Sequence, residues 1–88
     1  MASIRILKSE INYLTFEIIS DCNTYMAIHP EKKQETLALV EKAVELRNNC
    51  IAKINQGKGE DHAYYSEIRT TLLKEADAIF SKLRDLIK

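Results

Sequence analysis

Arg47 is the residue best placed to do chemistry, because the sequence puts its charge among apolar side chains. Hydrophobic residues recur at three- and four-residue spacing between Glu31 and Asn55. On a helix that advances about 100° per residue, Arg47 falls near the middle of their shared face. Burying a guanidinium without a partner is costly, so it needs a carboxylate or a route to solvent. We predict that Arg47 faces inward and meets Glu17 or Glu75.

A second arginine, Arg69, interrupts the apolar face of the last helical segment at nearly the same height and leans toward Glu10. Two interpretations follow. The arginines form structural ion pairs, which are common and which we favour. Alternatively, Arg47 and Arg69 bind a small carboxylate or phosphate in a helical pocket, with Glu10, Glu17 and Glu75 as charged partners.

Other reactive side chains lack the neighbours that catalysis requires. Neither Cys22 nor Cys50 has a histidine placed near it by the sequence, and a nucleophile needs an adjacent base or a lowered pKa. The stretch Gly57–Gly59 is too short for a phosphate-binding loop and lacks the following Ser or Thr. We predict no catalytic residues and no cofactor, and we lean against an enzyme.

Three predicted helices, at about residues 9–28, 31–55 and 62–86, position these side chains. Ser9 is a candidate N-cap for the first helix, and residues 1–8 read as either an extended arm or a first helical turn. Pro30 separates the first two helices, because proline disfavours helix at the preceding residue and suits the first helical position. Gly57 is a natural C-terminal cap, and Asp61 can cap the third helix.

Short connections between these helices predict an all-α, antiparallel up-down-up three-helix bundle that forms one domain over residues 1–88. In this topology the two cysteines lie on the order of 20 Å apart, too far for a disulfide. His29 and His62 fall at opposite ends, so they cannot share a metal, and we predict no metal site. The second helix carries an unusually wide apolar face, comprising Leu37, Leu39, Val40, Ala43, Val44, Leu46, Cys50, Ile51 and Ile54.

Composition excludes several classes of function. The 88 residues carry 13 basic and 13 acidic side chains, with no block of like charge. Sequence-independent binding of nucleic acid requires a basic face. Because the sequence shows none, we predict no nucleic-acid partner. No apolar run is long enough to span a membrane or to act as a signal peptide, so we predict no membrane partner and a cytoplasmic location.

Some apolar residues lie beyond the surface that three helices can bury. Tyr13 and Phe16 project past the stripe of the first helix, and Leu39 and Leu46 lie at one margin of the second. Exposed apolar patches on small proteins often mark interfaces, and two-fold dimers are the commonest assemblies. The alternative is a larger core or scattered exposed hydrophobic residues, which are normal.

These observations predict a non-enzymatic module that associates with itself, as a homodimer completing the bundle, or with another protein. The alternative function is a small-anion binder or enzyme that uses the inward-facing Arg47 and Arg69.

Overall fold

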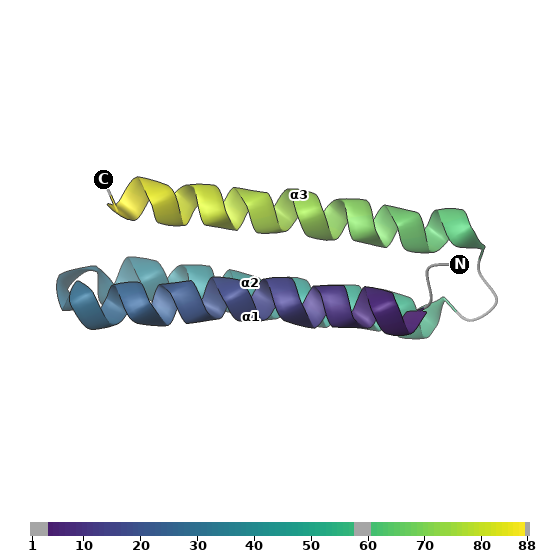
Figure 1. The fold of residues 1–88 in the computed structure, drawn as a ribbon, viewed down its shortest axis with the longest axis horizontal. Coiled ribbons are helices and arrows are strands. Elements are labelled where there is room, and N and C mark those ends of the chain that lie inside the picture. Colours follow the sequence, from purple (N-terminus) through teal and green to yellow (C-terminus); the bar gives the residue numbers. More distant parts are fainter. Residues whose placement is uncertain (1–3, 58–60, 88) are drawn as a thin grey trace.

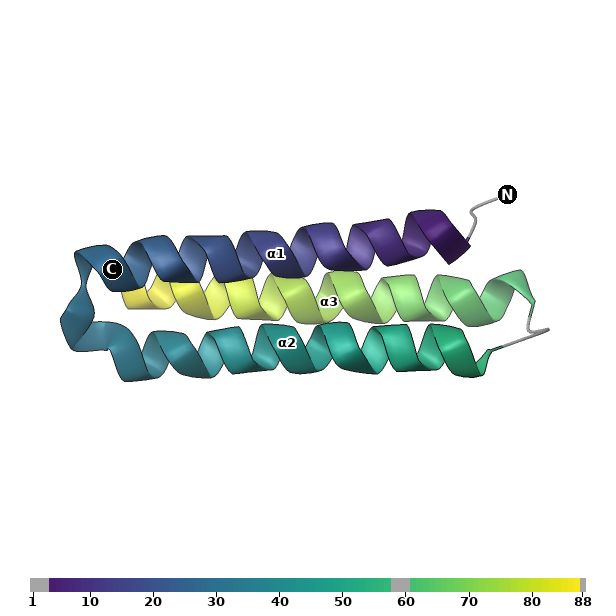
Figure 2. The same ribbon diagram turned by 90° about the horizontal axis from the view of Figure 1, so that it is seen from below.

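The computed structural model describes residues 4–57 and 61–87 and consists of three helices, each antiparallel to the one before it in the chain. These are α1 (Ile4–Ile28), α2 (Lys33–Gln56) and α3 (His62–Ile87), with a single 3-10 turn, η1 (Pro30–Lys32), between α1 and α2. Their Cα atoms form a rod of 47 × 17 × 16 Å. α3 lies over the groove between α1 and α2 (Figures 1 and 2). The predicted all-α three-helix bundle is confirmed.

Each helix buries one stripe of residues at three- and four-residue spacing, the pattern of an amphipathic helix. Two threonines lie in these stripes, and both satisfy their hydroxyl groups locally. Thr15 Oγ1 donates to the Ile11 carbonyl and Thr36 Oγ1 to the Lys32 carbonyl, each at 2.8 Å. The apolar core consists of Leu7, Ile11, Ile18, Cys22 and Tyr25 of α1; Leu39, Ala43, Leu46, Cys50 and Ile54 of α2; and Ile68, Leu72, Ala76, Ile79 and Leu83 of α3.

α1 begins five residues earlier than predicted, at Ile4 instead of Ser9. Leu7 is buried and continues the stripe of Ile11 by one further helical turn. Most helical stability in proteins comes from packing of the apolar face, so this burial outweighs the preference of serine for a cap. Ser9 is an exposed residue inside the helix, and the predicted N-cap is wrong.

The turn between α1 and α2 is short and held by local contacts. The ring of His29 packs on Tyr25 with 4.8 Å between ring centroids, and its Nδ1 lies 3.1 Å from the Glu31 carboxylate. A backbone hydrogen bond and the contact with His29 lower the pKa of Glu31. Pro30 opens the segment, as predicted, but as the 3-10 turn, and the α-helix begins only at Lys33.

The connection between α2 and α3 is held by two tyrosines. The hydroxyl of Tyr64 donates to the Lys53 carbonyl at 2.7 Å, and that of Tyr65 donates to the carbonyl of Gly57. Gly57 ends α2 as predicted, and a Cβ at this position would run into the Tyr64 ring. Asp61 Oδ1 accepts a hydrogen bond of 3.2 Å from the backbone N–H of Tyr64, which confirms the predicted cap.

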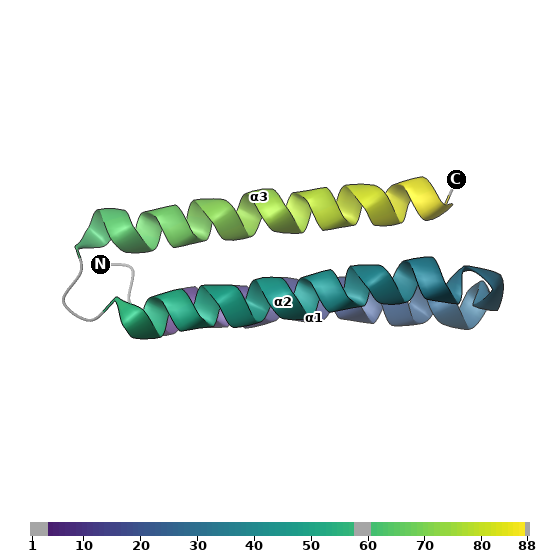
Figure 3. The ribbon, with the colours of Figure 1, turned by 180° about the vertical axis from the view of Figure 1, so that it is seen from behind.

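α2 is an unbroken helix, but it buries a narrower and differently centred face than predicted. Leu37 and Val44 are 38% and 42% exposed. Leu39 and Leu46, which we predicted to be interface residues, are buried in the core. The stripe centres on the small residues Ala43 and Cys50, an orientation that keeps the side chain of Arg47 in water. The desolvation cost of a guanidinium favours this rotation. Figure 3 shows α2 in front of α1.

Candidate functional site

Arg47 is exposed, so the predicted inward orientation is wrong. Its Nε donates to Asn12 Oδ1 of α1 at 2.8 Å, and its Nη1 donates to Asn48 Oδ1 at 3.2 Å. Both acceptors are neutral. Within the described residues, neither Glu17 nor Glu75 forms an ion pair with it. Arg47 therefore closes the outer edge of the α1–α2 contact with hydrogen bonds to amides.

Arg69 meets its predicted partner, Glu10. The Nε of Arg69 lies 3.0 Å and 3.2 Å from the two carboxylate oxygens, and its Nη2 lies 3.1 Å from Oε2. The hydrogen bond and the charge of Glu10 raise the pKa of Arg69. Because the pair lies at the surface, water and salt screen it, and it adds little to stability.

The two arginines do not form one pocket. Their partners Glu10 and Asn12 are two residues apart on α1, which separates them by about 200° around the helix. Arg69 contacts one flank of α1 and Arg47 the opposite flank. The helix stands between the two guanidinium groups, so the anion pocket predicted from this pair is absent from the described structure.

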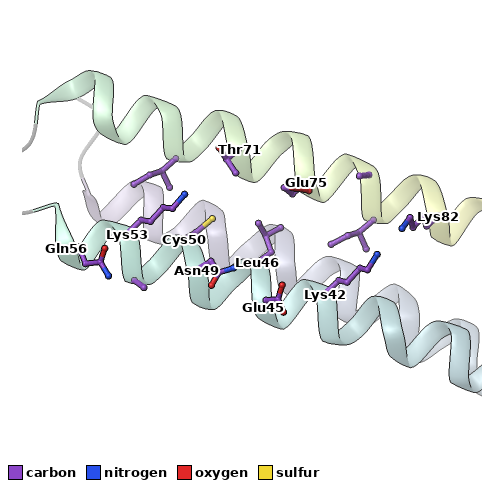
Figure 4. Close-up of a pocket in the computed structure, with 14 residues that line it drawn as sticks. Lys42, Glu45, Leu46, Asn49, Cys50, Lys53, Gln56, Thr71, Glu75 and Lys82 are labelled. Carbon is purple, nitrogen blue, oxygen red and sulfur yellow. The ribbon is translucent and has the colours of Figure 1, made fainter.

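The structure instead has a groove between α2 and α3 (Figure 4). Its volume of about 590 Å³ lies within the range of small-molecule sites. Glu75, predicted as a partner of Arg47, lines this groove on the other side of α2. We call its inner surface the apolar floor, formed by Leu46, Cys50, Ile68 and Ile79. The polar rim consists of Lys42, Glu45, Asn49, Lys53, Gln56, Thr71, Glu75 and Lys82.

Two lysines lie at one end of the groove, Lys42 from α2 and Lys82 from α3 (Figure 4). The Lys42 ammonium lies close enough to lower the pKa of Lys82, through a side-chain contact and through its charge. The ion pairs of the described residues are His29–Glu31 and Glu10–Arg69, so neither lysine has a carboxylate partner there. Sequence analysis missed this pair because each lysine lies on the polar side of its own helix.

A third feature is the outward face of α1. Tyr13 and Phe16 are 64% and 69% exposed, in agreement with the prediction that they project beyond the core. They belong to a line of exposed, uncharged residues at three- and four-residue spacing along the helix. We call this line the outer seam of α1, consisting of Ser9, Tyr13, Phe16, Ser20, Asn23 and Ala27.

The remaining candidates do not converge. His29 and His62 lie at opposite ends of the bundle, as predicted. The described residues contain no group of three or more His, Cys, Asp or Glu side chains that could hold a metal ion. Cys22 and Cys50 are free and buried, and burial raises the pKa of both thiols. None of the helices in residues 4–57 and 61–87 carries the continuous apolar stretch that a membrane span requires.

Comparisons of the chain with protein-family profiles, with curated proteins and with solved structures find no match in any of the three sets.

Proposed function

We propose that this protein is a non-enzymatic interaction module that associates with a second copy of itself through the outer seam of α1. The observation that carries the proposal is the exposure of Tyr13 and Phe16 on the outer seam, whose six residues carry no charge. An exposed apolar patch with a polar surround is typical of interaction sites. Closed two-fold dimers are the commonest way for such a patch to be covered.

The order of large and small residues along the seam favours a second copy as the occupant. Two α1 helices packed antiparallel across their outer seams, with the two-fold axis at the height of Ile18 along the helix, would place Phe16 opposite the partner's Ser20. The same axis places Tyr13 opposite the partner's Asn23. In an antiparallel pair, two residues face each other when they lie equally far from the axis on either side of it, as Phe16 and Ser20 do and as Tyr13 and Asn23 do. Large side chains then enter spaces left by smaller ones, as in the knobs-into-holes packing of paired helices.

This arrangement has an electrostatic consequence. Glu17 flanks the seam, and a two-fold axis across the seam at the height of Ile18 brings the two Glu17 carboxylates of a dimer to the same rim. Like charges at an interface rim oppose association and are screened by salt. We therefore expect dimerisation to strengthen as the salt concentration rises and in the Glu17→Gln variant. A parallel arrangement would not show this response at Glu17.

Sedimentation velocity from micromolar to millimolar protein concentration tests the proposal. We expect a concentration-dependent dimer that Phe16→Lys weakens by about thirtyfold or more, as truncated aromatic anchors typically do. Leu73→Lys is the matched control, because Leu73 is exposed on α3 and lies outside the seam. A protein that stays monomeric over this range, or a dimer that Phe16→Lys leaves unchanged, would overturn the proposal.

The proposal also places the protein in the cytosol. Cys22 and Cys50 support this location, because both are free thiols buried in the core. A reducing compartment keeps such thiols from forming intermolecular disulfides when the protein unfolds transiently.

A further inference from the structure

The groove between α2 and α3 is polar at one end and apolar along its inner surface. Lys42 and Leu46 are four residues apart on α2, and Ile79 and Lys82 are three apart on α3. Residues at these spacings share one face of a helix. Each ammonium therefore lies at the edge of the apolar floor, where an amphipathic ligand would meet charge and apolar surface together.

The charges at this end are unbalanced. Lys42 lowers the pKa of Lys82, which is the effect of one positive charge close to another. The other titratable groups on the rim are Lys53 toward the far end and Glu45 and Glu75 nearer the middle (Figure 4). In the described residues neither glutamate forms an ion pair with the two lysines. An anion held between Lys42 and Lys82 would relieve their repulsion.

We propose that this groove binds a small amphipathic carboxylate, with its carboxylate between Lys42 and Lys82 and its apolar chain along the apolar floor. An ammonium group is a compact point charge with several N–H donors, so a pair of them can share the two oxygens of one carboxylate.

The shape of the groove favours a ligand with a chain over a simple anion. The lining residues of α2 run from Lys42 to Gln56, a length of about 21 Å at 1.5 Å per residue. An anion without a chain would contact only the exposed ammonium groups, and exposed charge pairs contribute little binding energy. A chain lying along the groove also covers the exposed methyl groups of Ala52 and Ala78 and the alkyl stems of the rim lysines, and burial of apolar surface is the main source of affinity in such sites.

The site is independent of the proposed self-association. The groove lies between α2 and α3, whereas the outer seam of α1 faces away from both helices. Loss of dimerisation in Phe16→Lys should leave ligand binding intact, and loss of binding in a lysine variant should leave the dimer intact.

Decanoate titrated into the isotope-labelled full chain, followed by backbone amide chemical shifts, tests the proposal. We expect the shifts to concentrate on the groove-lining segments of α2 and α3. Two controls separate the parts of the ligand: decanol has the chain without the charge, and acetate has the charge without the chain. Each should bind at least about tenfold more weakly than decanoate, because it lacks either the charge or the apolar chain. Equal binding of decanol and decanoate would overturn the proposal.

Lysine variants make the test specific to this site. The double variant Lys42→Gln/Lys82→Gln should bind decanoate about tenfold more weakly, because two charge-assisted hydrogen bonds become neutral ones. It should remain folded, since the change removes a repulsion. Lys74→Gln, an exposed lysine of α3 outside the groove, is the matched control and should bind as the unaltered protein does. Unchanged affinity in the double variant would overturn the proposal. So would shifts spread equally over the outer seam, which indicate unspecific surfactant binding.

Discussion

The contact of α2 with α1 and its contact with α3 differ in how completely side chains fill the space between the two helices. Toward α1, partly buried Val40 and Ile51 pack on the core, and Arg47 hydrogen-bonds Asn12 across the edge. Toward α3, long polar side chains line an open groove that has Lys42 at one end. The same helix therefore makes one sealed contact and one accessible contact.

The difference follows from the side chains on the two flanks of α2 and from the two connections. Branched apolar residues fill the space beside α1, and burying them favours close approach of the helices. The flank beside α3 carries Lys42, Asn49 and Lys53, whose polar ends must stay in water. The α1–α2 turn is a single 3-10 turn, whereas the α2–α3 connection begins at Gly57 and ends at Asp61. Side-chain chemistry and the length of the connection thus act together to close the α1–α2 contact and to leave the groove between α2 and α3 open.

Replacing one alanine in the core and one on the groove with leucine should show the difference between packed and open regions most strongly. Ala43 is fully buried at the centre of the α2 stripe, and Ala43→Leu should destabilise the bundle by about 1–3 kcal/mol through overpacking. Ala78 is exposed on the groove, and Ala78→Leu should change stability by no more than about 0.5 kcal/mol. Urea unfolding measures both. Equal losses in the two variants would mean that the groove is as tightly packed as the core.

Gly57→Ala tests the connection that holds α2 and α3. The added methyl group would displace the Tyr64 ring and break its hydrogen bond to the Lys53 carbonyl. We expect a loss of about 1–2 kcal/mol in thermal or urea unfolding, from the displaced ring and the lost hydrogen bond. In a Tyr64→Ala background the same change should cost little. A penalty that persists without the Tyr64 ring would show that the backbone at Gly57, and not the ring, is the constraint.

Arg47→Met should have a smaller effect, within about 0.5 kcal/mol, because the arginine is exposed and bonded to neutral amides. Asn12→Ala serves as the partner variant, and a double-mutant cycle isolates the hydrogen bond between them. A loss several times larger than this would place Arg47 in a buried site, as the sequence first indicated.

The smallest effect is electrostatic and appears only in alkaline solution. The pKa of Lys82 is lowered in the folded chain, so the folded state releases its proton at a lower pH than the unfolded state. In the window just below the ordinary lysine pKa of about 10.4, the unfolded state binds more protons, and stability rises with pH. Lys82→Gln should flatten this rise in urea unfolding, whereas Lys74→Gln should preserve it. The same slope in all three proteins would mean that Lys42 and Lys82 do not interact.

Part of the candidate chemistry could be predicted from local spacing. The pairing of Arg69 with Glu10 followed from their estimated heights on neighbouring helices, and the structure confirms it. The pair of Lys42 and Lys82 could not be predicted, because it depends on the rotation of two helices at once. The prediction for Arg47 was wrong for the same reason, because a modest rotation of α2 moves its side chain from the core to the edge of the α1–α2 contact.

The sequence by itself determined the three helices, the breaks at Pro30 and Gly57 and the cap at Asp61, because these depend on periodicity and local backbone chemistry. Only the tertiary structure decided which apolar residues of α2 enter the core. Its apolar arc spans about half the circumference, wider than the bundle buries. The bundle buries Leu39 and Leu46 and leaves Leu37 and Val44 exposed. This outcome depends on the packing of α1 and α3 and on the free-energy cost of burying Arg47.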